Sequence, residues 1–257
     1  MGGWISDDSV ESAACSPPVS TGARSMKTNC TNVEWIGRAK CAVCEMRNSV
    51  LFSDLSPHEM DSILQPIDNL HVPQHAVLYE QGKPAPNLFT VRSGLVKLKV
   101  DLPNGAQRIV RLLRPGDVAG METLVGEPYH HTAIALQDAD VCRIPREVVI
   151  RLDQTNPSVH QALLRRWQHL VDQADHFISS LSTGPAEARM ARLLITLGCD
   201  IRPETMPSRE DMGALLGITT ETASRIMAEF KRRGLVHVDT GSEVVCYHAG
   251  LTLLANG

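Results

Sequence analysis

The chain has 257 residues, a length that allows two domains, each with a hydrophobic core of its own. Hydrophobic residues make up 43% of the sequence and charged residues 21%, which is ordinary for a soluble globular protein. The formal net charge of −4 does not by itself suggest binding to nucleic acid, so any such contact must come from a local basic patch.

The N-terminus and the cysteines bear on where the protein works. The sequence has no run of about 18 apolar residues, so no transmembrane helix is expected. Asp7, Asp8 and Glu11 lie where a signal peptide would have its apolar core. We therefore expect a cytoplasmic protein with no membrane partner. Seven cysteines in a reducing compartment favour metal or redox chemistry over a disulfide framework.

The first 29 residues are rich in Ser, Gly, Pro and Thr, and we expect a disordered lead that contains Cys15. The composition changes at Cys30, and Cys41 and Cys44 follow as a C-x-x-C pair. Such a pair can bring two thiolates to one metal, and it occurs in zinc sites, redox dithiols and iron–sulfur clusters. Unligated thiols in a helical segment are the simpler alternative. No second C-x-x-C or His pair lies nearby, so a fourth ligand must come from elsewhere.

The middle of the chain changes from a helical to a strand pattern. Asp54–Asn69 indicates a short helix with Ser56 as its N-cap. Leu88–Val91 and Leu95–Val100 look like strands, and Pro-Asn-Gly at 103–105 is a hairpin signal before the strand RIVRLL. Glycines recur at expected turns, namely Gly82, Gly94, Gly105 and Gly116. Short strands with frequent turns predict an antiparallel barrel or jelly-roll-like unit.

A long helix is predicted from Ser158 to Leu181. Its apolar residues alternate spacings of four and three, and the resulting heptad seam consists of Leu163, Trp167, Leu170, Ala174, Phe177 and Leu181. Leu164, Val171 and Ile178 broaden this face, so one part can pack on the strands while the seam meets a partner. The pattern favours a parallel homodimer, and a core helix within one chain is the alternative.

Residues 208–234 predict two short helices with a turn at Gly217, where Ser208 caps the first helix and Thr219 the second. Four apolar residues of the second helix should face inward, namely Ala223, Ile226, Met227 and Phe230. The opposite face is polar and consists of Thr220, Glu221, Ser224 and Arg225. A basic run that includes Lys231 closes the helix. This pattern is typical of a DNA-reading helix-turn-helix, and an ordinary two-helix unit with a solvated charged face is the alternative.

Further elements flank the helix-turn-helix. Before it, Pro185–Leu197 predicts a helix with Arg189 and Arg192 exposed. After it, LVHVDTGSEVVCYH predicts two strands around residues 239–242, which would form a wing. The cysteines of this half are expected to be structural thiols, Cys199 and Cys246.

Three stretches carry a family resemblance: RSGLVKL around Gly94, RPGDVAG at 114–120, and the following LVGEPYHHTAIAL. They resemble the β-roll of the CRP/FNR superfamily of bacterial transcription regulators, and the likeness extends from about Cys41 to Tyr247. It implies an α+β fold with an N-terminal antiparallel β-roll (jelly-roll-like, of the cyclic-nucleotide-binding-domain type), a long dimerisation helix and a C-terminal winged helix-turn-helix. The expected divisions are a lead, a cysteine-bearing segment, the β-roll sensor domain, the dimerisation helix and the DNA-binding domain, at residues 1–29, 30–53, 54–156, 157–182 and 183–257.

The resemblance bears on the effector. Cyclic-nucleotide-binding members carry a Glu for the ribose hydroxyl and an Arg for the cyclic phosphate. This sequence has Met121 at the place of the Glu, although Glu122 adjoins it, and Tyr129 at the place of the Arg. Because the phosphate would lose its main charge-assisted contact, cyclic AMP is not expected as the effector. His130 and His131 could suggest a metal or haem, but a polar loop is the simpler interpretation.

Cys142, considered alone, would be a small buried core residue. In the resemblance it matches the single cysteine that completes a four-cysteine [4Fe–4S] site in the oxygen-sensing FNR branch, whose other three ligands precede the β-roll. Thiolates select iron–sulfur clusters or zinc. Val50 stands where that branch usually has its last N-terminal cysteine, so the expected metal ligands are Cys30, Cys41, Cys44 and Cys142. Cys15 or a non-cysteine group is the alternative to Cys30.

The resemblance implies a homodimeric regulator, not an enzyme, whose binding to double-stranded DNA is switched by an oxygen- or redox-responsive [4Fe–4S] cluster, with RNA polymerase as a further partner. Its reading residues resemble those of FNR-type regulators, which recognise palindromes with TTGAT-like half-sites. The expected DNA-contacting residues are Ser208, Thr219, Thr220, Glu221, Thr222, Ser224, Arg225 and Lys231. One alternative is the same regulator switched by a small effector, by thiol–disulfide exchange or by zinc. Another is a metal- or thiol-dependent enzyme, for which no Ser-His-Asp, phosphate-loop or paired-carboxylate pattern is present.

Overall fold

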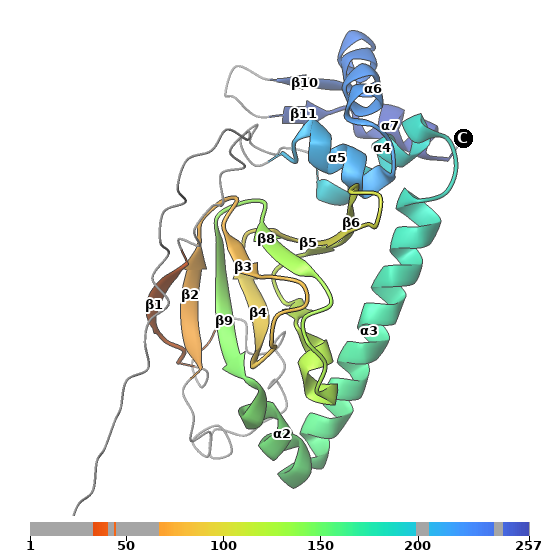
Figure 1. Cartoon of the computed structure of the whole chain (residues 1–257). Helices are drawn as coiled ribbons and strands as arrows, with labels where there is room; N and C mark the ends of the chain where they lie inside the picture. Colours follow the sequence, from red (N-terminus) through yellow and green to blue (C-terminus); the bar gives the residue numbers. More distant parts are fainter. Residues whose placement is uncertain (1–32, 41–43, 45–66, 199–205, 239–243, 257) are drawn as a thin grey trace, which may run out of the picture.

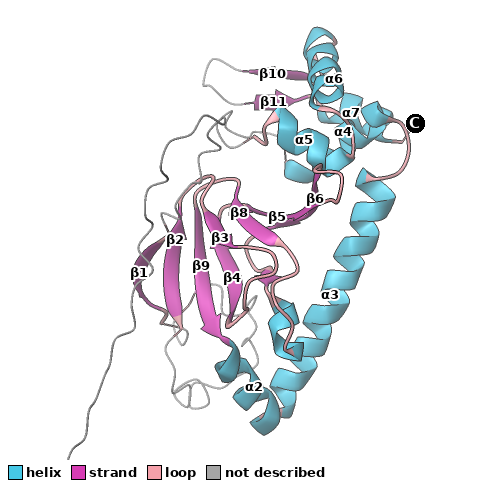
Figure 2. Ribbon diagram, in the orientation of Figure 1, coloured by secondary structure: helices cyan, strands magenta, loops and turns pink. Residues whose placement is uncertain are grey.

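A computed structural model describes residues 33–40, 44, 67–198, 206–238 and 244–256. A β-rich body and a helical C-terminal body are joined by one long helix, α3 (Pro157–Leu181), which runs along the side of the first body (Figure 1). Figure 2 shows that strands dominate the first body and helices the second. Within the described ranges, none of the helices has the length and apolar character needed to span a membrane.

The first body consists of two antiparallel sheets. One sheet has the strand order β1-β2-β9-β4-β7, and the other has the order β3-β8-β5-β6. Their strands are β1 (Glu34–Arg38), β2 (Asp68–Val72), β3 (Val77–Tyr79), β4 (Asn87–Ser93), β5 (Val96–Asp101), β6 (Gln107–Leu113), β7 (Val118–Ala119), β8 (Thr132–Ala135) and β9 (Ala139–Pro145). The antiparallel β-roll expected from the sequence is confirmed.

Strands of the roll alternate between a buried face and a more exposed face, as their residues predict. In β5, Val96 and Leu98 are buried in the interior of the roll, whereas Lys97 and Lys99 point away from it and are only partly buried. The turn between β5 and β6 falls on the Pro-Asn-Gly sequence, where Gly105 has the positive φ of 79° that favours glycine. The predicted β5–β6 hairpin is therefore confirmed.

One segment of the roll differs from the sequence prediction. The helix expected over residues 54–69 lies mostly outside the described residues, but its last two residues, Asp68 and Asn69, belong to β2. This strand pairs with β9 and buries Leu70 and Val72 in the core of the roll. Pairing with the neighbouring strand β9 therefore makes Asp68 and Asn69 part of a strand, although the local sequence pattern favours a helix.

Two short helices follow strands of the roll without having been indicated by the sequence. They are the 3-10 helix η3 (Met121–Val125) and the α-helix α2 (Arg146–Thr155). Val148 and Val149 of α2 pack in a cluster with Val159 and Leu163 at the beginning of α3. The end of α3 contacts the second body, since Leu181 is buried in the core of that body. The long helix is thus fixed to both bodies of its own chain.

The C-terminal body consists of α4 (Ala186–Leu197), α5 (Arg209–Leu216), α6 (Thr220–Arg232), β10 (Val236–Val238), β11 (Val244–Cys246) and α7 (His248–Ala255). β10 and β11 form the antiparallel pair expected of a wing. The core is fully buried around Leu193, Leu194, Met212, Phe230 and Leu251. Cys246 is buried beside them, whereas Cys199 lies outside the described residues. The sequence did not indicate α7, because its eight residues are almost all apolar and show no helical period.

Arg189 and Arg192 of α4 are half-buried, so the prediction that they are exposed is wrong. The Arg189 guanidinium donates a hydrogen bond to the carbonyl oxygen of Leu216, at the end of α5. Arg192 donates to three further carbonyl oxygens, those of Ser180, Thr183 and Ala255. The last carbonyl groups of a helix have no partner within the helix. The two arginines satisfy such groups and are therefore drawn into the domain.

Candidate nucleic-acid interface and sensor residues

Side-chain caps fix the beginnings of α5 and α6. Ser208 Oγ accepts a hydrogen bond from the amide of Asp211 at 3.0 Å, and Thr219 Oγ1 accepts one from the amide of Thr222 at 3.1 Å. Between the helices, Gly217 takes the left-handed conformation (φ 66°, ψ 39°) that ends α5. Both predicted caps and the predicted turn are confirmed. They set the direction in which α6 leaves α5.

One face of α6 is buried and the other is exposed. The buried residues are those predicted to face inward, Ala223, Ile226, Met227 and Phe230. The exposed residues are Thr220, Glu221, Ser224 and Arg225. Of the other residues expected to contact DNA, Thr222 is partly buried, and the exposed ones are Ser208, Thr219 and Lys231. The structure therefore gathers the polar side chains of α6 on the outside of the domain.

Basic side chains lie at the C-terminal end of α6. Lys231 is exposed, and Arg232 binds the Glu229 carboxylate through two hydrogen bonds of 2.9 and 2.7 Å. The major groove of DNA is about 12 Å wide and admits one α-helix. A helix with a polar outer face, an exposed Arg225 and a basic end has the shape and charge to enter it.

Cys142 of β9 is buried in an apolar cluster that also contains Leu88, Met121, Val148 and Leu163. Its Sγ atom lies 3.4 Å from Oδ1 of Asn69. Ala39, two residues before Cys41, packs against the same cluster, and its amide donates to the carbonyl oxygen of Ile67 at 2.7 Å. The chain therefore comes to the cluster around Cys142 immediately before it enters the C-x-x-C pair.

The described residues include two of the four expected metal ligands. Cys142 is buried and Cys44 is partly buried, whereas Cys30, Cys41 and the alternative ligand Cys15 lie outside the described residues. In the part of the chain that the structure describes, His, Cys, Asp and Glu side chains form no group of three that could hold a metal ion. The four-cysteine site remains a prediction.

Aromatic side chains fill the roll where the resemblance places the phosphate-binding Arg. The buried Tyr129 ring stacks on Tyr79 with centroids 4.0 Å apart, and Tyr79 stacks on Phe89 at 5.6 Å. The Tyr129 hydroxyl donates to the carbonyl oxygen of Asn87 at 2.8 Å. Burial raises the pKa of Tyr129 to about 12, which keeps the phenol neutral. A neutral phenol lacks the positive charge with which a guanidinium binds a phosphate.

The residues next to Tyr129 form a polar loop over η3. Oε1 of Glu122 accepts a hydrogen bond from the amide of His130 at 3.0 Å, and Met121 is buried. The ring of His130 is exposed, whereas burial lowers the pKa of His131 and favours its neutral form. This arrangement agrees with the simpler interpretation of the two histidines.

A row of apolar residues is exposed along the outer side of α3. Its members are between 38% and 60% exposed, and they are Leu164, Trp167, Val171 and Ile178. The predicted seam is placed differently. Leu163 and Leu181 are buried in the cores of their own chain, Leu170 and Phe177 pack against those cores, and Ala174 is partly buried. The exposed row is therefore displaced around the helix from the predicted one, with Trp167 common to both.

These features define a class of protein. A β-roll that a long helix connects to a winged helix-turn-helix, with a capped, polar-faced second helix, is a DNA-binding transcription regulator. Residues 69–156 match the family model described as a cyclic nucleotide-binding domain, and residues 188–251 match the one described as a Crp-like helix-turn-helix domain. The chain belongs to the CRP/FNR family, whose members are transcription regulators and not enzymes.

Similar proteins agree with this assignment. The chain is 27% identical to electron transport regulator A of Shewanella oneidensis over 224 residues, which cover 84% of this chain and 90% of that protein. It is 27% identical to the anaerobic regulatory protein of Aggregatibacter actinomycetemcomitans, over 77% of this chain and 80% of that protein. Among solved structures, FixK2 from Bradyrhizobium japonicum has the same fold, with a TM-score of 0.64 and 22% identity over 73% of this chain and 96% of that one.

Proposed function

We propose that this regulator acts as a homodimer that reads a DNA palindrome and is switched by an oxygen- or redox-responsive, cysteine-ligated [4Fe–4S] cluster. The observation that carries the DNA-reading part is the capped helix α6, which keeps its apolar residues inside and its polar residues outside. The names of two similar proteins refer to electron transport and to anaerobic regulation, and they support a response to oxygen or redox state.

Three exposed residues of α6 would read bases. Arg225 can donate two hydrogen bonds to O6 and N7 of guanine, and Glu221 can accept one from N4 of cytosine. Ser224 can contact a neighbouring base edge or phosphate. The resemblance of this arrangement to FNR-type readers supports TTGAT-like half-sites. Thr220 stands where those readers often have an apolar residue or Arg, so the outer base is where we expect a different preference.

Contacts with the DNA backbone would come from hydroxyl groups and a lysine. Ser208 caps α5, and Thr219 and Thr222 lie at the beginning of α6. Hydroxyl groups and amides at helix N-termini bind phosphate oxygens, and such contacts position a protein without reading sequence. Lys231 would add an exposed positive charge at the other end of α6.

A second copy of the chain would cover the exposed row of α3. Large apolar side chains in a row on the outer side of a helix are the surface that a coiled-coil partner buries. We therefore propose an interface centred on Leu164, Trp167, Val171 and Ile178, in place of Leu163 and Leu181. Two-fold pairing gives two α6 helices and hence two half-sites about one helical turn apart.

The surroundings of Cys142 fit a cluster. The side chain is buried among apolar residues, and Ala39 brings the N-terminal segment to the same place. Thiolates are the ligands that iron–sulfur clusters require, and the proposed set is Cys30, Cys41, Cys44 and Cys142. In the unligated thiol form, Sγ of Cys142 donates to Oδ1 of Asn69, and ligation would replace this contact because a thiolate has no proton to donate. When bound, the cluster would supply a cross-link that oxygen can destroy.

Ligation would couple the N-terminal segment to the dimerisation helix. Leu163 of α3 belongs to the cluster that contains Cys142, so the proposed ligation of Cys142 would take place directly beside α3. Its loss would change the packing against α3 and shift the population between two arrangements of the paired helices. In this proposal cyclic AMP has no role, because the family resemblance puts Tyr129 at the position of the phosphate-binding Arg and the Tyr129 ring stacks on Tyr79 instead. RNA polymerase is the proposed partner on DNA, as the family resemblance implies.

The switch is tested by purifying the full chain without oxygen and measuring visible absorbance, iron, sulfide and zinc. We expect about four irons and four sulfides per chain, which is the content of one [4Fe–4S] cluster. The Cys142→Ser variant should lose them. Cys246→Ser is the matched control, because Cys246 is also buried but lies in the DNA-binding domain, and this variant should retain the cluster. A colourless wild-type protein that contains zinc or no metal would contradict the cluster.

A further inference from the structure

The β5–β6 hairpin of the roll packs against the DNA-binding domain. Ile109 of β6 is buried in the core of that domain. The Arg114 guanidinium donates a hydrogen bond to the carbonyl oxygen of Thr196 in α4. Arg108 lies against Gly217 so closely that a Cβ atom at this glycine would overlap its guanidinium. Figure 1 shows β5 and β6 below α5. The orientation of the DNA-binding domain is therefore fixed by contacts with the sensor domain.

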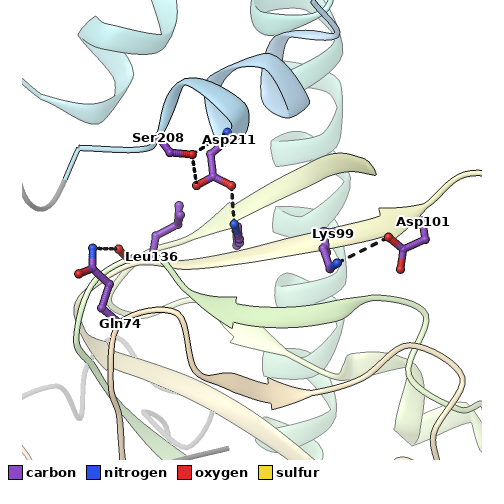
Figure 3. A network of polar contacts seen from close by, with 7 residues as sticks. Gln74, Lys99, Asp101, Leu136, Ser208 and Asp211 are labelled. Atoms are coloured by element: carbon purple, nitrogen blue, oxygen red, sulfur yellow. Dashed lines mark hydrogen bonds and ion pairs between the residues drawn. The ribbon is translucent and has the colours of Figure 1, made fainter. Parts of the chain in front are cut away.

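An ion pair links the two domains near the N-terminus of α5. Nζ of Lys97 in β5 donates to Oδ1 of Asp211 in α5, and the two side chains are 13% and 12% exposed. The other carboxylate oxygen, Oδ2, accepts a hydrogen bond from Ser208 Oγ at 3.0 Å (Figure 3). Because both charges are largely removed from water, loss of one partner leaves the other buried and uncompensated. The pair is therefore able to hold one orientation of the domain.

The hairpin also faces the beginning of α6. A cleft of about 1180 Å³ lies between the hairpin and the helix-turn-helix. On the hairpin side its lining includes Lys97, Lys99 and Arg108. On the other side it includes four hydroxyl residues, Ser208, Thr219, Thr220 and Thr222. The hydroxyl groups that the proposed DNA complex uses for phosphates thus line a cleft that the sensor domain closes on one side.

The width of a major groove bears on whether DNA fits beside the hairpin. An α-helix with its side chains is about 10–12 Å wide. The major groove is about 12 Å wide, so its two walls lie against both sides of a helix inside it. The hairpin shares a cleft with the first turn of α6, and the lining of this cleft includes Thr219, Thr220 and Thr222. A groove wall that reached these residues would therefore meet the hairpin.

The geometry points to an interdomain latch, by which we mean the ion pair between Lys97 and Asp211: it holds the DNA-binding domain against the β5–β6 hairpin in an arrangement that excludes DNA. This inference rests on the proposed DNA-reading function of α6. DNA binds the open arrangement alone, so its apparent affinity is reduced by the fraction of open molecules. A variant that weakens the latch therefore binds DNA more tightly than the wild type.

The test measures the affinity of the full chain, prepared without oxygen, for a palindromic duplex. Lys97→Met removes the latch cation and should tighten binding about tenfold, the factor that corresponds to 1.4 kcal/mol. Lys99→Met is the matched control. Lys99 lines the same cleft, but its Nζ lies 3.5 Å from Asp101 Oδ1 of its own strand (Figure 3). This control should not tighten binding.

The sign of the effect separates the latch from its main alternative. If the hairpin lysines contacted DNA phosphates, both substitutions would weaken binding and lower its salt dependence. Weaker binding by Lys97→Met would therefore overturn the latch. Tighter binding cannot be a general charge effect, because removal of a positive charge disfavours association with DNA.

A second measurement does not depend on DNA. Urea unfolding of Lys97→Met, Asp211→Asn and the double variant forms a double-mutant cycle. We expect the double variant to lose less free energy of unfolding than the sum of the losses of the two single variants. Additive losses would show that the ion pair is not formed in solution and would overturn the latch. If the proposed DNA-reading function is wrong, neither the wild type nor any variant binds the palindrome. The losses of unfolding free energy in the double-mutant cycle then remain non-additive.

Discussion

Helices α3 and α6 carry the two halves of the proposed function, and they differ in what they expose. Each buries one apolar face within its own chain. The outer face of α6 is polar, whereas the outer face of α3 carries the apolar row around Trp167 and Val171. A polar face is well solvated by water, so α6 needs no partner to keep its outer face stable. Exposed apolar surface costs about 25 cal/mol per Å², so the proposed burial of this row by a second copy would lower the free energy of the protein. The exposed face of each helix thus supports the partner proposed for it, which is DNA for α6 and a second copy of the chain for α3.

The largest expected effect concerns the inner face of α6. Phe230 is fully buried in the core of the DNA-binding domain, and Phe230→Ala should lower the free energy of unfolding by about 3–5 kcal/mol. Arg225→Ala, on the outer face of the same helix, should change it by less than about 0.5 kcal/mol. Urea unfolding measures both variants. Similar losses for the two would contradict the division of α6 into an inner and an outer face.

The next effect concerns the outer face of α3. Val171→Glu places a charge in the exposed apolar row and should convert the dimer to a monomer. Affinity for a palindrome should then fall on the order of 100-fold, because the two reading helices no longer bind as one unit. Sedimentation and DNA-binding measurements check this result. Ser179→Glu is the control, since Ser179 is exposed on the same helix outside the row. Dimers that persist in Val171→Glu would refute the proposed interface.

A smaller effect distinguishes base reading from backbone contact on α6. Arg225→Ala should weaken binding to the preferred palindrome by about 1–3 kcal/mol and reduce discrimination against altered half-sites. Lys231→Ala should weaken binding to all sequences alike and reduce the salt dependence. Competition experiments with single-base variants of the duplex measure both properties. Equal effects of the two substitutions on every sequence would remove Arg225 from the reading residues.

The smallest effect compares how the two helices begin. Thr219 caps α6 with its side chain, so Thr219→Ala should lower the free energy of unfolding by about 1 kcal/mol. Asn156 precedes α3 but makes no side-chain cap, and Pro157 occupies the first turn instead. Asn156→Ala should therefore leave the stability nearly unchanged. Thermal unfolding of both variants tests this, and equal losses would show that the cap of α6 contributes nothing specific.

Local features of the sequence predicted the helix-turn-helix well. Ser208, Gly217 and Thr219 act on residues that are close in the chain, so their roles as caps and turn can be inferred from residue type and spacing. The alternation in β5 and the turn at Gly105 are equally local. The predicted features in these segments were therefore found in the structure.

Features that depend on distant parts of the chain were missed. The heptad spacing of α3 fits two adjacent rows, and packing on the chain's own cores decides that Leu163 faces inward and Leu164 outward. Arg192 was expected in water, but carbonyl groups of α3 and α7 bind it. The pairing of Lys97 with Asp211 joins two domains across the sequence, and no local pattern indicates it.

In the proposed dimer, paired α3 helices present two α6 helices to one palindrome. Native mass spectrometry of the full chain, prepared without oxygen, can count chains on a palindromic duplex and on a duplex with one half-site. We predict two chains on the palindrome and binding on the order of 100-fold weaker to the single half-site. One chain per duplex, with equal affinity for both duplexes, would contradict the account.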